Sequence, residues 1–349
     1  MSGFVRLDTE FINEVSMSDP NNGNMSPEEY YHLAKKSRDS GVPIATLQKL
    51  DNLKYKKPKY TRLSEKKLYK KVKEACQINN LPECLEVPVF KCIAEYLKNG
   101  VSQPILLTGN AGIGKTYFAK VLADIIGLGF FKISAPGASF GYGLAGDSPN
   151  YKSARYGEIS NARLMTDSTN PVILVDEIDK AQHSQSASSH NIEDELLSCL
   201  DGTRTIKDNF LNRDIDTKGI VFVLTANEDK KISPWLKDRC CVIHFPDPDF
   251  DRVLAISVKM LDKINGTLLY RGRIDADYRD FTDALQTIYA DGVRSLRRYD
   301  AIIREAATVA YTEFLESEAN EISLTFRHLD IAYCNLFVDD PGLHGKDMS

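Results

Sequence analysis

The stretch Pro104–Thr116 reads PILLTGNAGIGKT and decides the fold. An apolar run, 104–108, leads into a glycine-rich turn, and Lys115 and Thr116 then open a segment with apolar residues at helical spacing. In a strand–loop–helix setting of this kind, backbone N–H groups can close around phosphate oxygens, and the dipole of the helix adds to the attraction. The sequence therefore predicts a phosphate-binding loop rather than an ordinary glycine-rich turn.

Each position of this loop has an expected part in holding a nucleotide. Lys115 is expected to reach the β- and γ-phosphates, and the Thr116 hydroxyl is expected to coordinate Mg²⁺. The loop and the residue that follows it give the predicted nucleotide contacts, which are Gly109, Asn110, Ala111, Gly112, Ile113, Gly114, Lys115, Thr116 and Tyr117.

Further apolar, β-branched segments recur along the chain. Near-continuous apolar runs separated by helical stretches are typical of a parallel sheet that is covered on both faces. After a PDPDF turn at 246–250, residues 251–337 read as helices. The predicted fold is α/β, with a five-stranded parallel sheet and helices on both faces, followed by a small α-helical lid domain. Besides 104–108, the predicted strands are 130–134, 171–176, 219–225 and 241–245.

An acidic pair follows the third predicted strand. Asp176 and Glu177 end the apolar run of PVILVDEIDK, at the strand edge where open α/β sheets bind ligands. Asp176 is expected to hold Mg²⁺ through water, and Glu177 to polarise the attacking water. The alternative, a favourable charge at a helix N-terminus, is less favoured because a phosphate-binding loop precedes the pair.

A polar residue also ends the fourth predicted strand, GIVFVLTAN. Asn227 is expected to orient the attacking water or to sense the γ-phosphate. The alternative is that this side chain only caps the next turn.

Together these motifs resemble the AAA+ ATPases, and most closely the ATPase module of the Lon proteases. The resemblance covers about residues 83–337. It is carried by EYLKNG before the first strand, by PVILVDEIDK, and by the run from Glu195 to Asn227. ISPWLKDRCCVIHF and DGVRSLRR complete it. It implies a P-loop AAA+ fold with ATP and Mg²⁺ as ligands.

The resemblance also implies roles for two arginines. Arg239, before the last strand, matches the arginine finger that reaches the nucleotide of a neighbouring subunit, where a guanidinium suits the charge on a transferring phosphoryl group. The alternative is a surface salt bridge with Asp238. Arg294 matches the lid arginine that contacts the γ-phosphate within the same chain.

Tyr151 falls at the position where Lon-type ATPases carry an aromatic residue facing the pore of the ring. In the family an aliphatic residue and a glycine follow this aromatic, whereas Lys152 and Ser153 follow it here. The resemblance implies that Tyr151 grips an extended polypeptide; the alternative is an aromatic residue on a surface loop.

Charge divides the chain further. Residues 54–73 hold ten Lys or Arg and a single Glu. We therefore expect an N-terminal extension with short helices and a basic linker over 1–75. The large nucleotide-binding domain is expected over 76–246, the lid over 247–337 and a tail over 338–349.

Composition excludes several other classes of protein. With 349 residues, 42% hydrophobic and 27% charged, the chain is typical of a globular protein. It has no apolar run near the roughly 18 residues of a membrane span, and its N-terminus lacks the layout of a secretory signal. Seven cysteines without a CxxC pair fit reduced thiols. These features favour a cytoplasmic protein with no membrane partner.

The expected function is that of a Mg-ATP-hydrolysing ring, most often a homohexamer. It would remodel or thread a protein substrate or drive a separately encoded effector, and no intrinsic protease is expected. The alternative is a nucleic-acid-dependent ATPase, a loader or regulator, that uses the basic segment 54–73. A solvated linker would also account for that segment.

Overall fold

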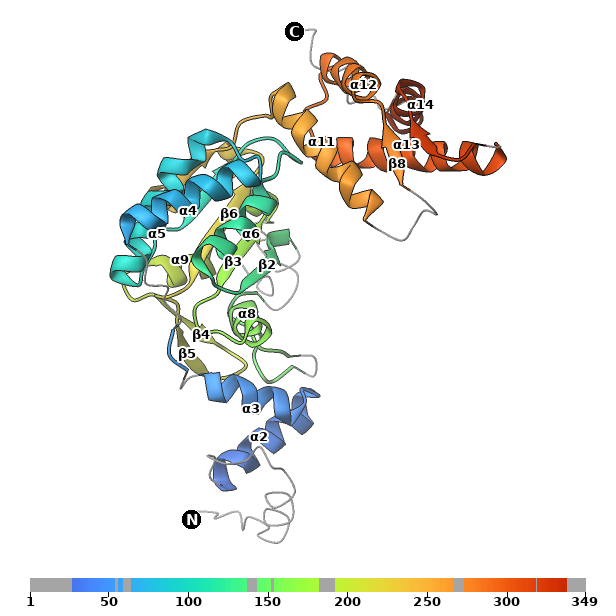
Figure 1. The fold of residues 1–349 in the computed structure, drawn as a ribbon. Coiled ribbons are helices and arrows are strands. Elements are labelled where there is room, and N and C mark those ends of the chain that lie inside the picture. The colour runs from blue at the N-terminus through green and yellow to red at the C-terminus, as the bar shows by residue number, and fades with distance from the viewer. Residues whose placement is uncertain are drawn as a thin grey trace, which may run out of the picture. The chain divides into compact units, whose positions relative to one another are not determined.

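A computed structural model describes most of the chain (Figure 1). The predicted tail 338–349, most of the basic linker 54–63 and the first 26 residues lie outside the described residues. Contacts divide the chain into two compact units. The first unit is Met1–Arg62, Glu95–Pro104 and Ile126–Leu224, and the second is Leu63–Ala94, Ile105–Ile125 and Thr225–Ser349. The described residues are 27–53, 56–58, 64–136, 143–151, 154–181, 192–266, 273–317 and 319–337.

A five-stranded sheet confirms the predicted fold. The pairs β2–β3, β3–β6 and β1–β7 are parallel, with Ser134 opposite Asp176 and Thr108 opposite His244. Every residue of β1 and β6 is buried, as the unbroken apolar runs require. Each predicted strand lies within two residues of an observed one. In sheet order the strands are β2 (Phe130–Ser134), β3 (Val172–Asp176), β6 (Val221–Ala226), β1 (Ile105–Thr108) and β7 (Cys241–His244).

The first unit also contains a hairpin that the sequence analysis did not predict. Its strands pair antiparallel with Asp208 opposite Arg213, and five of their eight residues are charged, so no apolar run marks them. In Figure 1 the blue helices α2 and α3 lie beside this hairpin and α8. The elements are α2 (Pro27–Ser40), α3 (Ile44–Asn52), α8 (Glu158–Thr166), the 3₁₀ turn η3 (Ile178–Lys180), α9 (Ile192–Leu200), β4 (Thr205–Asp208) and β5 (Arg213–Asp216).

In the second unit, part of the basic segment is a helix rather than a linker. Helix α4 (Glu65–Ile78) buries Leu68, Val72 and Cys76, which recur every four residues, and exposes its lysines. This apolar spacing was hidden among charged residues. Two helices, α5 and α6, continue into the first unit. The other elements before the lid are η2 (Glu83–Leu85), α5 (Glu86–Asn99), α6 (Lys115–Ile126), η4 (Asp229–Lys231) and α10 (Pro234–Arg239).

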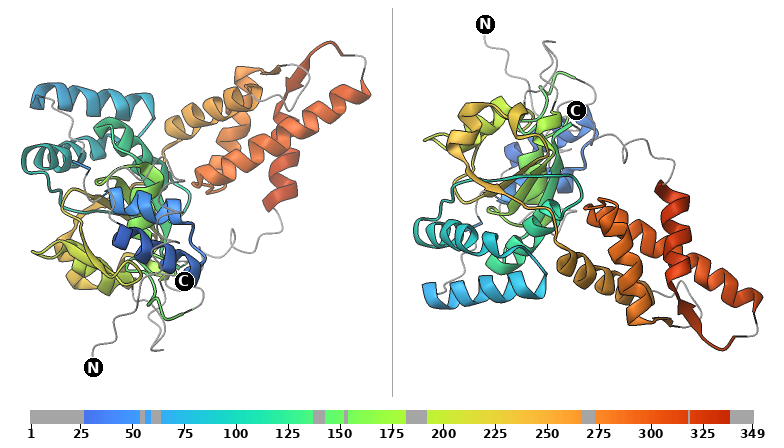
Figure 2. Two further views of the ribbon diagram at one scale, coloured as in Figure 1. Left: turned by 90° about the horizontal axis from the view of Figure 1, so that it is seen from below. Right: turned by 90° about the horizontal axis from the view of Figure 1, so that it is seen from above.

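The lid follows in the same unit, and the two views of Figure 2 show its helices in orange to red. Asp249 and Asp277 cap α11 and α12 by accepting backbone N–H groups. The prediction that this region is all helical is wrong at two short strands, whose three residues each are too few for a periodic pattern. The elements are α11 (Phe250–Asn265), β8 (Ile274–Ala276), α12 (Tyr278–Ala290), α13 (Leu296–Glu316), β9 (Ile322–Leu324) and α14 (Phe326–Phe337).

No helix among the described residues combines the length and the apolar character needed to cross a membrane.

Candidate functional site

The loop between β1 and α6 follows a backbone path that glycine alone takes readily. Gly109, Gly112 and Gly114 have φ angles of 138°, 78° and 107°, in the range that other residues rarely adopt. A Cβ atom at Gly109 would lie 2.4 Å from the Phe245 carbonyl oxygen, and one at Gly112 would lie 2.2 Å from Ser295 Oγ. The glycines therefore form a cradle that larger residues would close.

Lys115 lies inside this cradle and is only 6% exposed. Its ammonium donates hydrogen bonds to the carbonyl oxygens of Gly109 and Asn110, both at 2.7 Å, and to Asn227 Oδ1 at 2.9 Å. The structure therefore brings together two residues that the sequence analysis assigned to one site from motifs 112 positions apart.

Helix α6 begins directly at this loop. Its first helical bond runs from the Phe118 N–H to the Gly114 carbonyl, at 3.0 Å. The amides ahead of that bond, including that of Thr116, point out of the N-terminal end of the helix, where an anion is stabilised. Phe118 is fully buried and packs edge-to-face on Phe245, with ring centroids 6.2 Å apart, which fixes the start of the helix.

The acidic pair lies in the first unit, at the end of β3. The Asp176 carboxylate pairs with Lys132 of β2 at 2.5 Å, and Glu177 pairs with Lys180 at 2.8 Å. Glu177 has φ 60° and ψ 48°, a left-handed conformation that costs a side-chain-bearing residue about 1–3 kcal/mol. The sequence analysis did not predict either lysine partner.

Two segments of the lid contact the loop 109–114, which the sequence predicts to bind phosphate and which is called the phosphate loop below. The Leu296 N–H donates to the Gly112 carbonyl at 2.9 Å. Asn110 Nδ2 donates to both carboxylate oxygens of Asp247 at 2.9 Å. The sequence analysis assigned Asp247 and Leu296 no part in this site, because no sequence motif marks a contact between the lid and the phosphate loop.

Arg252 of α11 joins three segments at this place. Its Nε donates to the Asn80 carbonyl at 2.8 Å and its Nη2 to the Ile113 carbonyl at 3.1 Å. The guanidinium also lies 5.3 Å from the centroid of the Phe245 ring, and burial lowers the pKa of Arg252. This arginine, also missed in the sequence, ties the lid and the turn after α4 to the phosphate loop.

Comparison with known proteins agrees with this arrangement. Residues 105–247 match a sequence model of the "ATPase family associated with various cellular activities (AAA)". Residues 105–247 are an AAA domain. The match spans the cradle, the acidic pair, Asn227 and Arg239, and it confirms the predicted family.

Curated relatives that this chain resembles over the AAA domain and its surroundings include Lon proteases. A mitochondrial Lon protease homolog of Phaeodactylum tricornutum is 31% identical over 231 residues, which are 65% of this chain and 25% of the relative. Lon protease of Clostridium acetobutylicum is 32% identical over 252 residues, 67% of this chain and 31% of the relative. Lon protease 2 of Bdellovibrio bacteriovorus is 33% identical over 170 residues, 48% and 21%. The chain thus spans between a fifth and a third of the length of these relatives.

The two arginines that the family resemblance assigns to the nucleotide site have other contacts in this structure. The Arg294 guanidinium lies 3.6 Å from the Tyr289 ring centroid and donates to the Tyr289 carbonyl at 2.6 Å. Arg239, exposed at the end of α10, donates to the Trp235 carbonyl at 3.1 Å. Among the described residues it forms no ion pair with Asp238. Both roles stay predictions.

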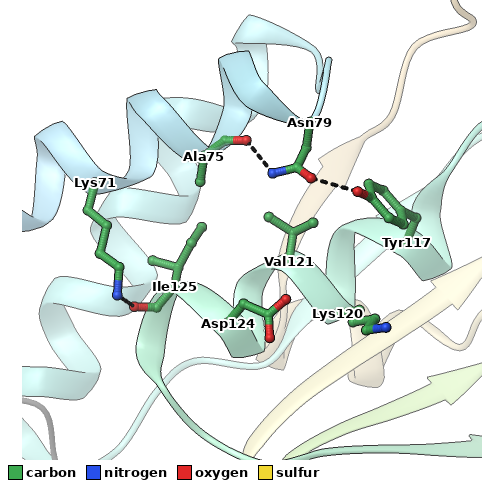
Figure 3. Close-up of a pocket in the computed structure, with 8 residues that line it drawn as sticks. All are labelled: Lys71, Ala75, Asn79, Tyr117, Lys120, Val121, Asp124 and Ile125. Atoms are coloured by element: carbon green, nitrogen blue, oxygen red, sulfur yellow. Dashed lines mark hydrogen bonds between the residues drawn. The ribbon is translucent and has the colours of Figure 1, made fainter. Parts of the chain in front are cut away.

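The Tyr117 side chain points toward Asn79 (Figure 3). Its hydroxyl donates to Asn79 Oδ1 at 2.6 Å, and the ring lines a groove of about 270 Å³ between α4 and α6. Lys71 also lines the groove and donates to the Ile125 carbonyl at 2.6 Å. The Tyr117 ring therefore lines this groove, and only the backbone of Tyr117 lies in the first turn of α6 beside the cradle.

Tyr151 is 67% exposed on a loop of the first unit. Its N–H donates to the Ser148 carbonyl at 3.2 Å, and its carbonyl accepts the Ala154 N–H at 3.1 Å. Backbone turns of this kind hold the main chain while the ring extends into solvent. Tyr151 is therefore accessible to a large partner.

Proposed function

We propose that this chain binds Mg-ATP and hydrolyses it. The observation that carries the proposal is the Lys115 ammonium, held in a glycine cradle and bonded to Asn227, within an AAA domain. Lys115 would neutralise the β- and γ-phosphates, and Asn227 would orient the attacking water. Glu177 would polarise that water, which matters only near the transition state.

Mg²⁺ would be held by oxygen ligands. The Thr116 hydroxyl and the Asp176 carboxylate are hard oxygen donors of the kind Mg²⁺ prefers, and Mg²⁺ commonly binds one or two such groups together with substrate phosphates. Among the described residues there is no group of three or more His, Cys, Asp or Glu side chains that could hold a metal alone. The cation would therefore arrive with the nucleotide and supply charge neutralisation at the phosphates.

We infer that the active form is a ring, most often a homohexamer. The exposed guanidinium of Arg239 supports a role in trans, because an arginine that must enter a neighbouring subunit's site has to be accessible. Arg294 would contact the γ-phosphate from the same chain once released from Tyr289. Hydrolysis would then move the exposed Tyr151 against a protein substrate or a separately encoded effector.

The test of the nucleotide site uses a pair of variants. Lys115→Ala is expected to lower ATP affinity by about 100-fold or more, whereas Glu177→Gln is expected to keep binding and to lose turnover by about 100-fold or more. Equilibrium binding and steady-state hydrolysis are measured on both. Lys120→Ala, an exposed lysine on the same helix, is the matched control. Wild-type turnover in Glu177→Gln would overturn the assigned roles.

The ring is tested by mixing inactive subunits. Arg239→Ala and Lys115→Ala are each expected to lose ATPase activity by about 100-fold or more, as for other groups that stabilise developing charge. Mixed, they should recover part of it, because each subunit supplies what its neighbour lacks. Lys237→Ala on the same helix is the control. Full activity of Arg239→Ala in a strict monomer, measured by sedimentation, would exclude the role in trans.

A second candidate function has one supporting observation. Helix α4 exposes five lysines of the basic segment, Lys66, Lys67, Lys70, Lys71 and Lys73, which favours a nucleic-acid-dependent ATPase. Binding of an oligonucleotide by this face should weaken steeply with salt, because phosphate contacts release counterions. Nucleic-acid stimulation of the ATPase that survives Tyr151→Ala would make this the preferred function.

A further inference from the structure

We propose that helices α2 and α3 are a brace for the loop that carries Tyr151, and that Arg213 is the positioning residue that anchors this brace. The Tyr151 loop is defined here by its described residues, 143–151 and 154–157, and the brace as residues 27–52. The consequence for coupled work rests on the proposed function of Tyr151. The proposal that the brace holds the loop in place is argued only from contacts within the first unit.

An apolar cluster joins the brace to the loop and to the hairpin. Leu47 of α3, Ala154 of the loop and Phe210 of the hairpin turn are each only 1% exposed and pack into one cluster with Val42. Tyr156 packs edge-to-face on Phe210, with ring centroids 6.4 Å apart. Three segments far apart in the chain therefore share one small core.

Lys36 of α2 adds a further contact to this cluster. Its ammonium lies 4.6 Å from the centroid of the Phe210 ring, a distance at which a cation is attracted to an aromatic face. Burial lowers the pKa of Lys36, and the charge of Asp208 opposes that effect. The brace thus reaches the hairpin turn from both of its helices.

Arg213 anchors the end of α3. Its Nη1 pairs with Asp51 Oδ1 at 3.1 Å, and its Nη2 donates to the Leu50 carbonyl at 2.8 Å. Both side chains of the ion pair are about three-quarters buried, so solvent screens the pair less than a surface pair. A guanidinium that holds a carboxylate and a helix-end carbonyl together fixes position as well as charge.

The base of the Tyr151 loop is held separately from the brace. Asn209 of the hairpin turn donates from its backbone to the Ala145 carbonyl at 2.8 Å and from Nδ2 to the Gly146 carbonyl at 3.0 Å. Asp208 accepts the Gly157 N–H at 3.0 Å. Beyond this base, Ala154 shares the apolar cluster with the brace, and Tyr156 packs against that cluster. The brace therefore acts on the half of the loop next to Tyr151.

The seam between α3 and the hairpin is not closely packed. A cavity of about 210 Å³ lies there, lined by Leu50, Leu53 and Arg163 among others, with Arg213 and Ile215 on the hairpin side. Because packing is interrupted at this seam, α3 is attached there by the apolar cluster and the two bonds of Arg213, in addition to its contacts with α8. Single substitutions should therefore loosen it without unfolding the domain.

The experiment compares Arg213→Met and Leu47→Ala with the wild type in the full chain. Methionine keeps the apolar stem and removes both bonds, and Leu47→Ala weakens the cluster from the other side. Lys56→Ala is the matched control, because it removes an exposed ion pair with Asp167 in the same extension. Hydrogen exchange is followed by mass spectrometry on peptides that cover residues 146–157.

The expected result is that exchange in these peptides is about 5–30-fold faster in both variants, as for a local loss of one to two kcal/mol, and unchanged in Lys56→Ala. Unchanged exchange in both variants would overturn the brace. Basal ATPase should stay within about 2-fold of wild type, while stimulation by unfolded casein should fall with the loosened loop.

The two readouts keep the proposals apart. Faster exchange establishes the brace even where casein does not stimulate the wild-type ATPase, and that absence of stimulation would count against polypeptide gripping by Tyr151. If Arg213→Met lost ATP binding while hydrogen exchange in the loop peptides stayed at the wild-type rate, the role of Arg213 in positioning the loop would be overturned.

Discussion

The phosphate loop and the Tyr151 loop each lead into a helix, α6 and α8, yet they are held by different kinds of contact. The phosphate loop is shaped by its own backbone, through glycines with positive φ and an ammonium bonded to loop carbonyls. The Tyr151 loop is positioned by side chains of the hairpin and of α3, more than 50 residues away in the chain on either side. A loop of the first kind tolerates few substitutions within itself, whereas a loop of the second kind can be loosened from a distance.

The largest expected effect is on the first loop. Gly109→Ala should lower the free energy of unfolding by about 2–4 kcal/mol, because the new Cβ would meet the Phe245 carbonyl and the φ angle is strained. Gly202→Ala is the matched control, since a Cβ there meets nothing within 4 Å, and it should change stability by less than about 1 kcal/mol. Urea unfolding measures both. Equal stabilities would show that the cradle does not need its glycine.

A smaller effect is expected from the tip of the second loop. Tyr151→Ala should change stability by no more than about 0.5 kcal/mol, as for other exposed side chains, and should leave basal ATPase activity intact. It should lose work coupled to a polypeptide, because alanine cannot supply the apolar contact area of the ring. Tyr278→Ala, equally exposed on the lid, is the control. A fall in basal hydrolysis would show that the two loops are not separable.

The smallest effect concerns a contact outside both loops. His328 of α14 lies 2.9 Å from Glu313 of α13, and this hydrogen bond lowers the pKa of Glu313. A carboxyl whose pKa is lower in the folded state stabilises the fold above its unfolded pKa near 4.5. That contribution is lost as the pH falls through the lower folded value.

Thermal unfolding between pH 3 and pH 6 tests this contact. Glu313→Gln should flatten the acid dependence of the melting temperature slightly and leave nucleotide binding unchanged. An identical acid dependence in the variant would show that the pair contributes nothing to the lid.

The same contrast explains what could be predicted from the sequence. The phosphate loop, β3 with its acidic pair and Asn227 were predictable because each depends on neighbouring letters: glycines in a loop, or a polar residue directly after an apolar run. The hairpin was not, because five of the eight residues in Thr205–Asp208 and Arg213–Asp216 are charged. The hairpin gains its stability from contacts with distant segments. The strands β8 and β9 were missed for lack of length, and α4 because lysines obscured its buried stripe.

For side-chain contacts within the site, too, only features set by neighbouring residues in the sequence could be predicted. Motifs indicated that Lys115 and Asn227 share a site, but nothing adjacent to Asp247 or Arg252 in the sequence signals their bonds to the loop. The orientation of Arg294 toward Tyr289 depends on a helix end five residues earlier, which a motif does not encode.

The carbonyl and amide oxygen atoms that accept hydrogen bonds from the Lys115 ammonium have a consequence for the order of events during a catalytic cycle. Neutral carbonyl and amide oxygens hold an ammonium more weakly than phosphate does, so nucleotide entry would be an exchange of partners for Lys115. On the proposed function, the same exchange would release the amide oxygen of Asn227, which becomes available to the attacking water only after phosphate has arrived. Nucleotide binding and the release of Asn227 for hydrolysis would then occur in a single step. In a subunit without nucleotide, Asn227 would stay bonded to Lys115 and could not orient the attacking water.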